Sequence, residues 1–162
     1  MGKVVFLGLG TNLGDRETIL NEAIEHLIKS AGDVISLSAI YETEPWGFQS
    51  ENKFLNMVVG LRTMLNPDAL LKRVMNIEAK LGRIRTGEGY SSRTIDIDIL
   101  LYNDLVINKP DLKIPHPLIR ERRFVLVPLC DVAPDLVHPV FKKTIASLLK
   151  ECKDDIQVKW FK

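Results

Sequence analysis

The run Thr-Ile-Asp-Ile-Asp-Ile-Leu-Leu at residues 94–101 constrains the fold more than any other segment. Successive side chains of a β-strand point to opposite faces, so the isoleucines are predicted to share one face and Asp96 and Asp98 the other. The two aspartate Cα atoms then lie roughly 7 Å apart. Unpaired charge is costly on so apolar a strand, and Mg²⁺ favours carboxylates together with substrate phosphates. The alternation therefore predicts either a strand with one solvated face or a metal-binding carboxylate pair.

Length and composition favour a single globular domain, and the charge balance gives it no overall attraction to a polyanion. The chain has 162 residues, of which 46% are apolar and 27% charged, close to the averages of soluble globular proteins. We therefore expect one domain over residues 1–162, with a core large enough to need no disulfide or structural metal. The formal net charge of +1 gives no overall attraction to nucleic acid or to an anionic membrane.

The cysteines and the apolar stretches favour a cytoplasmic location. Only Cys130 and Cys152 occur, without a C-x-x-C motif, so a disulfide framework and a zinc site are both disfavoured. The apolar N-terminal run is broken by glycines and is too short for a signal peptide. No stretch approaches the about 18 consecutive apolar residues of a membrane span.

Hydrophobic periodicity predicts a core that contains both strands and helices. Residues 15–31 and 67–81 repeat apolar side chains every three or four positions, as amphipathic helices do, and a short helix is predicted at 144–152. Residues 124–129 are predicted to form a strand or packed coil. The predicted strands cover residues 3–9, 34–41, 54–63, 94–101, 105–107 and 157–161.

The order of the first six elements, β-α-β-β-α-β, predicts an α/β (α+β) fold with a ferredoxin-like split βαβ core. Such a core has a mainly antiparallel sheet, and we expect the helices to pack on one side of it. A doubly wound parallel fold would need strict alternation of strands and helices, which the connection between the second and third strands breaks.

The glycines after the first strand do not form a known nucleotide-binding loop. Gly8, Gly10 and Gly14 follow the spacing G-x-G-x-x-x-G rather than G-x-G-x-x-G, and no G-K-[ST] occurs in the chain. A Rossmann or P-loop site is therefore disfavoured. We predict that these glycines serve the turn between the first strand and the first helix.

Two arginine clusters are candidates for phosphate binding. Arg83, Arg85 and Arg93 flank the loop that leads into the aspartates, and the planar guanidinium suits phosphate oxygens. Carboxylates, arginines and a glycine-containing loop together are typical of phosphoryl transfer, although arginines beside carboxylates also form ordinary surface ion pairs.

The second cluster consists of Arg120, Arg122 and Arg123 and follows His116. It is either a solvated basic turn or a second group that holds a polyphosphate. His116, between two prolines, suits a structural hydrogen bond as well as it suits a ligand contact. His26 and His138 are both assigned to structural roles.

Aromatic side chains near predicted loops could sandwich a planar heterocycle, because flat rings favour offset stacking. Each of them individually also fits ordinary core or loop packing. Asn56 shares a predicted strand face with Phe54, and its amide offers a donor and an acceptor together. The aromatic residues in question are Trp46, Phe48, Phe54, Tyr90 and Phe124.

Seven segments, in this order and spacing, resemble the 6-hydroxymethyl-7,8-dihydropterin pyrophosphokinase family of folate biosynthesis. Together they span nearly the whole chain, which makes the resemblance far more specific than the aspartate pair alone. The segments are GLGTNLGD (8–15), YETEPWG (41–47), FLN (54–56), GRIR (82–85), RTIDIDILLY (93–102), IPHP (114–117) and RRFVLVPL (122–129).

The resemblance implies a ferredoxin-like fold and transfer of pyrophosphate from ATP to the pterin hydroxymethyl group, with release of AMP. Asp96 and Asp98 would hold two Mg²⁺ ions that bridge the triphosphate. Arg83 and Arg93 would stabilise charge on the transferring group, each from a loop that closes over ATP. The implied partners are the small molecules ATP and the pterin, without nucleic acid or membrane, and we expect a monomer.

The resemblance also assigns binding residues. The implied ATP contacts are Glu78, Arg85, His116 and Arg122. The implied pterin contacts are the rings of Phe54 and Phe124, the polar groups of Thr43 and Asn56, the backbone around Glu44 and Trp46, and Tyr90 as an aromatic lid.

The chain departs from many relatives at two places. Residues 89–92 read Gly-Tyr-Ser-Ser where many relatives carry a basic residue, Trp, Gly and Pro, which bears on loop closure. Met75 stands where some relatives place a polar residue near the adenine base, which bears on base recognition.

Two other functions remain open from the residues alone. One is a Mg²⁺-dependent nucleotidyl or phosphoryl transferase with another acceptor, which would release ADP or free pyrophosphate instead of AMP and a pyrophosphorylated pterin. The other is a non-enzymatic ferredoxin-like module that binds a small ligand. Turnover that survives replacement of both Asp96 and Asp98 by Ala would favour the binding module.

Overall fold

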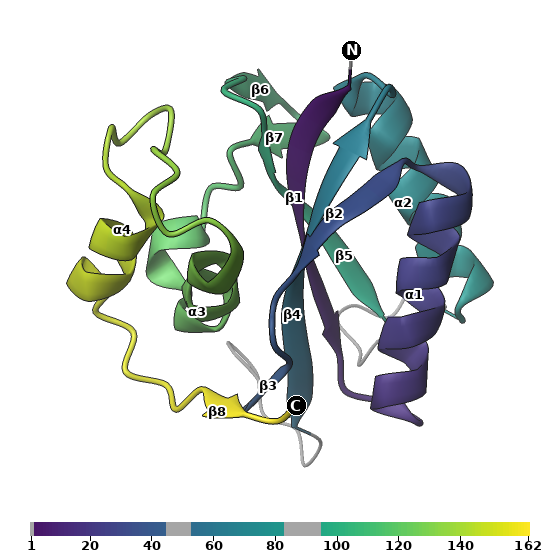
Figure 1. The fold of residues 1–162 in the computed structure, drawn as a ribbon, viewed down its shortest axis with the longest axis horizontal. Helices are drawn as coiled ribbons and strands as arrows, with labels where there is room; N and C mark the ends of the chain where they lie inside the picture. The colour runs from purple at the N-terminus through teal and green to yellow at the C-terminus, as the bar shows by residue number, and fades with distance from the viewer. Residues whose placement is uncertain (1, 45–52, 83–94) are drawn as a thin grey trace.

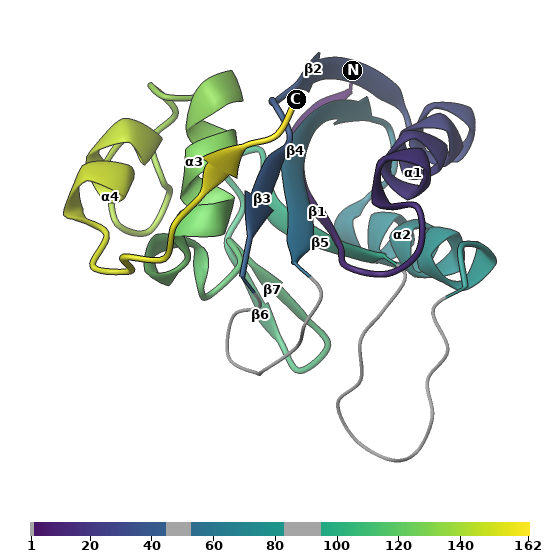
Figure 2. The ribbon, with the colours of Figure 1, turned by 90° about the horizontal axis from the view of Figure 1, so that it is seen from below.

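A computed structural model describes residues 2–44, 53–82 and 95–162 of the chain. In these residues a six-stranded antiparallel sheet is covered by helices on both faces (Figures 1 and 2). The sheet consists of β1 (Lys3–Thr11), β2 (Asp33–Leu37), β3 (Tyr41–Thr43), β4 (Phe54–Thr63), β5 (Asp96–Tyr102) and β8 (Lys159–Trp160), in the order β5-β1-β4-β3-β8 with β2 also paired to β4. The remaining elements are α1 (Arg16–Ser30), α2 (Pro67–Lys80), α3 (Arg123–Val132), α4 (Ile145–Glu151), the 3₁₀ turn η1 (Ile119–Glu121) and the hairpin β6 (Ile107–Lys109) with β7 (Leu112–Ile114).

Helices α1 and α2 begin where the sequence predicts, because each has a side chain that caps its first turn. The Asp15 carboxylate accepts a hydrogen bond from the backbone N–H of Thr18 at 3.3 Å. The Asn66 side chain accepts one from Ala69 N–H at 2.8 Å, and Pro67 occupies the first turn. Both arrangements satisfy N–H groups that have no partner inside a helix. The observed order is β-α-β-β-β-α-β, which agrees with the predicted β-α-β-β-α-β except that the second predicted strand is divided into β2 and β3.

The sheet separates two hydrophobic cores, so the expectation of helices on one side only is wrong. Helices α1 and α2 cover one face, whereas α3 and α4 cover the other (Figure 2). The core under α1 and α2 includes Val5, Leu7, Leu20, Leu27, Leu55, Val74, Ile77, Ile95, Ile97 and Ile99. The core under α3 and α4 includes Phe6, Val58, Leu100, Leu101, Leu126, Leu129, Ile145 and Leu148.

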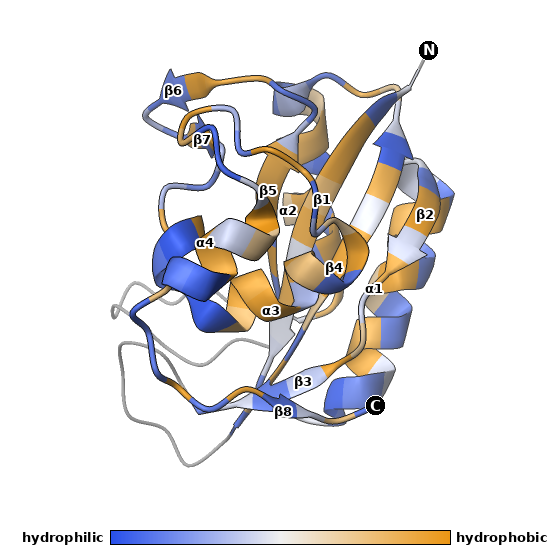
Figure 3. Cartoon of the chain, turned by 60° about the vertical axis from the view of Figure 1, so that its left-hand side comes forward, coloured by the Kyte–Doolittle hydropathy of each residue, from blue (hydrophilic) through white to orange (hydrophobic). Residues whose placement is uncertain are grey.

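The segment predicted as a strand or coil at 124–129 is helical, and it forms most of α3. Val125, Leu126 and Leu129 are buried against the sheet, at the three- and four-residue spacing of an apolar helix face. A short apolar run fits a buried strand and a buried helix equally well, so its periodicity alone does not decide. Figure 3 shows α3 over the hydrophobic strands of the sheet.

Several other boundaries differ from the sequence predictions. The strand predicted at 34–41 is divided into β2 and β3, because the Ser38 hydroxyl, instead of a ladder carbonyl, accepts the hydrogen bond from Val58 N–H at 2.8 Å. The strand predicted at 105–107 lies at β6, and β7 has no counterpart among the predicted strands. Gly8 and Gly10 lie within β1 rather than in the following turn, where Gly14 has a φ of 66°.

Candidate active site

Three neighbouring strands bring an acid, a glycine and an amide into one row. Gly10 of β1 pairs with Asp96 of β5 on one side and with Asn56 of β4 on the other. Directly paired residues of an antiparallel sheet project to the same face, and two strand spacings place Asp96 and Asn56 about 10 Å apart at Cα. Gly8 pairs with Asp98 in the next row of the same face. Both predicted metal ligands and the predicted pterin amide therefore share one face.

Gly10 keeps this face open between the amide and the carboxylates. A Cβ at Gly10 would lie 3.1 Å from Asn56 Oδ1 and 3.8 Å from Phe54 Cδ1. Any other residue would thus place its side chain against Asn56 and Phe54, on the surface between β4 and β5. Glycine inside a strand often marks such a close approach by a ligand or another chain.

The amide of Asn56 is held in one orientation. Its Nδ2 donates a hydrogen bond of 2.7 Å to the hydroxyl of Thr43, and both side chains are buried. Thr43 in turn pairs with Phe54 across β3 and β4, which places the three side chains on one face. Glu44 follows Thr43 and is exposed, with its carboxylate 3.7 Å from Lys53 Nζ. Fixed polar groups beside an aromatic ring are suited to reading the edge of a heterocycle.

The two aspartates lie on β5 as predicted. Ile95, Ile97 and Ile99 are buried in the core under α1 and α2, whereas Asp96 and Asp98 are half-buried on the opposite face. Asp96 and Asp98 each make further polar or electrostatic contacts. Because they share a face, both carboxylates could contact one ligand.

Glu78 of α2 holds β5 through a hydrogen bond to its backbone. Its side chain is 3% exposed, and Oε2 accepts a hydrogen bond of 2.9 Å from the backbone N–H of Ile97, the residue between the two aspartates. Because β5 is an edge strand of the sheet, this N–H would otherwise lack a partner in a ladder. The predicted ATP contact of Glu78 stays a prediction, and the described contact is to the backbone of β5.

His116 lies close to both Asp96 and Arg122 and is neutral near pH 7. Burial, together with the positive charge of Arg122, lowers the pKa of His116 to about 4, and the negative charge of Asp96 opposes the shift. Nδ1 accepts a hydrogen bond from Leu118 N–H at 3.1 Å, so the ring proton is carried by Nε2. The His116 backbone N–H is held by the carbonyl of Leu100 at 2.9 Å. A neutral donor at this place suits a phosphate oxygen.

Arg122 and Phe124 lie at the start of α3, over the face of the sheet that carries the aspartates. The guanidinium carbon of Arg122 is 5.6 Å from the centroid of the Phe124 ring, a cation–π distance. Phe124 is partly buried against the core under α3 and α4. Its neighbour Arg123 donates its backbone N–H to Asp154 at 3.0 Å.

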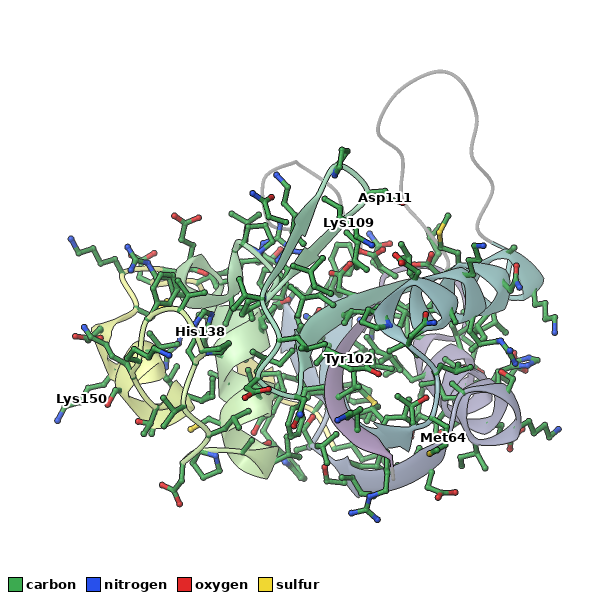
Figure 4. The ribbon with its side chains drawn as sticks, turned by 90° about the horizontal axis from the view of Figure 1, so that it is seen from above. Met64, Tyr102, Lys109, Asp111, His138 and Lys150 are labelled. Atoms are coloured by element: carbon green, nitrogen blue, oxygen red, sulfur yellow. The ribbon has the colours of Figure 1, made fainter. Side chains whose placement is uncertain are left out.

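The other predicted residues are placed as follows. The described residues do not include Arg83, Arg85, Arg93, Trp46, Phe48 or Tyr90. Met75 is exposed on α2. The structural role predicted for His138 is confirmed, because its Nδ1 accepts hydrogen bonds from the N–H groups of Val140 and Phe141, and its ring stacks on Phe141 with centroids 4.3 Å apart. Figure 4 labels His138 among the side chains of the structure.

Asp96 and Asp98 have the donor chemistry of a magnesium site. Among the residues described, no group of three or more His, Cys, Asp or Glu side chains is arranged to hold a metal. Mg²⁺ is commonly bound by one or two carboxylates, with waters and substrate phosphates completing its octahedron. The pair therefore fits an ion that is shared with a phosphate-bearing substrate.

Sequence reasoning missed two features of the site. The glycine spacing predicts a turn at Gly10, although a glycine flanked by β-forming residues can also be the sign of a close approach in a strand. Asp154 carries no local signal, because its partner Arg123 is 31 residues away in the chain. Its role becomes visible only in three dimensions.

Residues 6–134 match the 7,8-dihydro-6-hydroxymethylpterin-pyrophosphokinase (HPPK) family. A 2-amino-4-hydroxy-6-hydroxymethyldihydropteridine pyrophosphokinase of Porphyromonas gingivalis is 48% identical over 84% of this chain and 94% of the relative. The enzyme of the same name from Aquifex aeolicus is 40% identical over 97% of this chain and 94% of the relative. The one from Bacillus subtilis is 44% identical over 82% of this chain and 79% of the relative.

Solved structures share the fold. A Plasmodium falciparum HPPK-DHPS triple mutant superimposes with a TM-score of 0.77 at 21% identity, and an HPPK-DHPS in complex with substrates with 0.76 at 20% identity. In both cases 93% of this chain is covered, and the chain spans less than half of the solved one, 44% and 43% respectively. Within the described residues, no helix is both long and apolar enough to cross a membrane.

Proposed function

The chain belongs to the 7,8-dihydro-6-hydroxymethylpterin-pyrophosphokinase family, and from this premise we propose which of its residues hold each substrate. The enzyme transfers pyrophosphate from ATP to the hydroxymethyl group of 6-hydroxymethyl-7,8-dihydropterin in folate synthesis. ATP is the co-substrate, and AMP is what remains of it after the transfer. The row formed by Asp96, Gly10 and Asn56 is the observation that carries the assignment below.

We propose that the pterin lies between Phe54 of β4 and Phe124 of α3. The fixed amide of Asn56 and the hydroxyl of Thr43 then read its polar edge, as their hydrogen bond and burial support. The empty side-chain position at Gly10 gives the heterocycle room to approach the sheet. The backbone around Glu44 and Trp46 and the ring of Tyr90 complete the proposed pocket.

ATP is proposed to bind on the Asp96 side of the same row. Neutral His116 donates from Nε2 to a phosphate oxygen, and Arg122, close to His116, contributes positive charge. Glu78 and Arg85 are proposed as further contacts of the nucleotide, and Arg83 and Arg93 as partners of the transferring group. Arginine is suited to this role because its fork matches phosphate oxygens.

Asp96 and Asp98 are proposed to hold Mg²⁺, with two ions expected. The metal would supply charge neutralisation and alignment of the triphosphate. The half-buried carboxylates on one face of β5 and the hydrogen bond that fixes the strand between them support this assignment. The protein therefore needs to hold two aspartates at a fixed separation, which a strand does better than a loop.

The reaction is an in-line displacement at phosphorus. The pterin hydroxymethyl oxygen forms a bond to the β-phosphorus of ATP, the bond from that phosphorus to the α-β bridging oxygen breaks, and the hydroxyl proton is lost. No covalent intermediate with a side chain is needed, because positioning and charge stabilisation supply most of the catalysis of phosphoryl transfer. The sheet face contributes the positioning, since it holds both substrates on one rigid surface.

We further propose a monomer with one catalytic domain over residues 1–162, located in the cytoplasm. The free thiols of Cys130 and Cys152 support a reducing compartment. Sedimentation at micromolar protein concentration tests the oligomeric state.

The assignment of the aspartates is tested by Asp96→Asn and Asp98→Asn. Each substitution keeps size and removes a charged ligand, so we expect kcat to fall by roughly two orders of magnitude or more while circular dichroism stays unchanged. Asp104→Asn is the matched control, because Asp104 is exposed in the turn after β5. AMP and pyrophosphorylated pterin are quantified as products. Near-normal turnover in either active-site variant contradicts the proposed metal ligands.

A further inference from the structure

The chain continues beyond α4 as a C-terminal strap, residues 152–162, which crosses to the opposite side of α3. It leaves α4 at Cys152, passes the first turn of α3, and ends as β8 beside β3 (Figure 1). The strap lies outside the part of the chain, residues 6–134, that matches the family. Two of its contacts are with elements that carry proposed pterin residues, and Phe161 and Lys162 also contact Arg16 and Glu17 of α1.

The first contact is made by Asp154. Its Oδ2 accepts a hydrogen bond from the backbone N–H of Arg123 at 3.0 Å, and its Oδ1 accepts one from Ile156 N–H at 3.2 Å. Arg122, at the N-cap position of α3, makes no side-chain capping bond. A helix is normally capped by the side chain of its own N-cap residue, whereas here Asp154, from a distant segment, supplies the capping carboxylate. Its negative charge also interacts favourably with the N-terminal end of the helix.

The second contact is made by the end of the strap. Trp160 and Lys159 pair with Tyr41 and Glu42 of β3, and Phe161 N–H donates to the carbonyl of Ile40 at 2.7 Å. β8 thus occupies the outer edge of β3, which would otherwise be an open strand edge. Since β3 carries Thr43, the strap also touches the element that holds the Asn56 amide.

The strap therefore joins the two sides of the proposed pterin pocket. Phe124 lies in the first turn of α3, beside the N–H group that Asp154 binds. Thr43 lies on β3, which β8 pairs. At its other end α3 is tied to β3 directly, because the Tyr41 hydroxyl donates to Asp131 Oδ2 at 2.7 Å. With α3 held at both ends, the position of Phe124 relative to β3 and β4 is fixed.

We propose that Asp154 is a positioning residue for the pterin site. It holds the first turn of α3 so that the Phe124 ring faces the Thr43–Asn56 pair at the distance that the heterocycle needs. The inference rests on the proposed contact between Phe124 and the pterin. Loss of the Asp154 bond should weaken pterin binding more than ATP binding, because Arg122 is the only proposed ATP contact at α3, whereas the proposed contacts of His116 and Glu78 lie on other segments.

The experiment compares Asp154→Ala with Asp154→Asn and Asp155→Ala in the full-length protein. The dissociation constant of 6-hydroxymethyl-7,8-dihydropterin is measured by titration calorimetry in the presence of Mg²⁺ and a non-hydrolysable ATP analogue. The analogue is also titrated alone, and the thermal midpoint of each variant is recorded. Asp155 is the matched control, because it is exposed and its replacement changes the net charge by the same amount.

Asp154→Ala is expected to weaken pterin binding about fivefold, the effect of losing one helix cap, and to change analogue binding less than about twofold. Asp154→Asn should fall between Asp154→Ala and the wild type, because its amide oxygen can accept from Arg123 N–H, whereas its NH2 group cannot accept from Ile156 N–H and the negative charge is lost. Asp155→Ala should match the wild type in both titrations. A purely structural role would instead lower the thermal midpoint and leave both dissociation constants of the folded protein unchanged.

A second variant removes the donor instead of the acceptor. Arg123 is the first residue of α3, a position that favours proline, and the preceding Arg122 is extended at φ −121° and ψ 102°, as a residue before proline should be. Arg123→Pro therefore removes the bonded N–H without interrupting the helix. It should weaken pterin binding as Asp154→Ala does, with no further loss in the double variant, whereas Arg123→Ala should not. This variant also keeps the test valid if Asp154→Ala does not fold.

The inference is overturned if pterin binding by both Asp154→Ala and Arg123→Pro stays within about twofold of the wild type, a change below the usual effect of a cap. It is equally overturned if both ligands weaken to the same extent, or if Asp155→Ala behaves as Asp154→Ala does. A wild-type protein that binds the analogue but not the pterin contradicts the proposed function itself, so the two failures are distinguishable.

Discussion

At the scale of single residues, the site depends on the lack of a side chain at Gly10. Gly10 lies between Asp96 and Asn56, and a Cβ there would be 3.1 Å from Asn56 Oδ1. Gly10→Ala should therefore press on the amide and reduce pterin affinity by roughly five- to thirtyfold, the cost of about 1–2 kcal/mol for a misplaced polar contact. Binding of an ATP analogue to the same variant is the internal control. Unchanged pterin affinity would show that the heterocycle does not approach the sheet at β1.

His116 makes stability depend on pH. Its pKa is about 4 in the folded chain, against 6.5 when unperturbed. Between these values the unfolded chain binds a proton that the folded chain does not, so the free energy of unfolding falls as the pH decreases through this window. Burial of His138 lowers its pKa too, and the contribution has the same sign.

Replacing His116 should flatten this pH dependence. Asn is the matched substitution, because its Oδ1 can accept the Leu118 N–H in place of Nδ1. Between about pH 7 and pH 5, His116→Asn should lose about 2 kcal/mol less unfolding free energy than the wild type. Urea unfolding at the two pH values measures the difference. Equal losses in both proteins would mean that His116 titrates normally in the folded chain.

At the scale of elements, α2 fixes the strand that carries the aspartates. The Glu78 carboxylate accepts the N–H of Ile97, between Asp96 and Asp98. Glu78→Ala leaves that buried N–H without this acceptor, which should cost about 1–3 kcal/mol of unfolding free energy and should lower kcat as the aspartates lose their alignment. Glu78→Gln retains an acceptor and should keep most of both. If Ala and Gln variants lose activity equally, the charge of Glu78 matters more than its hydrogen bond.

Elements with strong local signals could be predicted from the sequence. Helices α1 and α2 have caps and apolar stripes, and β5 alternates strictly, so their positions follow from nearby residues alone. The break between β2 and β3 could not be predicted, because it depends on a bond from Val58 N–H to the Ser38 hydroxyl, 20 residues away. α3 is short and apolar, and only its packing on the sheet selects a helix.

The arrangement of the candidate site could be predicted from the sequence only in part. The spacing of Asp96 and Asp98 is enough to predict that both lie on one face, because a strand has a side-chain period of two. The row that joins Asp96 to Asn56 through Gly10 needed the pairing of three strands. The cap from Asp154 to α3 needed the complete path of the chain.

At the scale of the whole molecule, one sheet is shared by two cores. β1 contributes Leu7 to the core under α1 and α2, and the adjacent Phe6 to the core under α3 and α4. β5 contributes to both cores as well. The pairing of β5 with β1 shifts at a bulge opposite Phe6 and Leu7, and there Leu100 and Leu101 belong to the core under α3 and α4. Each helical layer packs on strands that also contribute to the other core. The site between α3 and the sheet therefore depends on both cores.

This sharing predicts a single cooperative unfolding transition. Leu20 of α1 and Leu126 of α3 are fully buried in different cores, and replacing either with Ala should cost about 2–5 kcal/mol. Because the sheet is common, each substitution should shift the urea midpoints of far-ultraviolet circular dichroism and of tryptophan fluorescence together. A variant in which the two signals separate, with Leu126→Ala unfolding α3 first while the rest stays folded, would mean that the helical layer beside the site is a unit of its own.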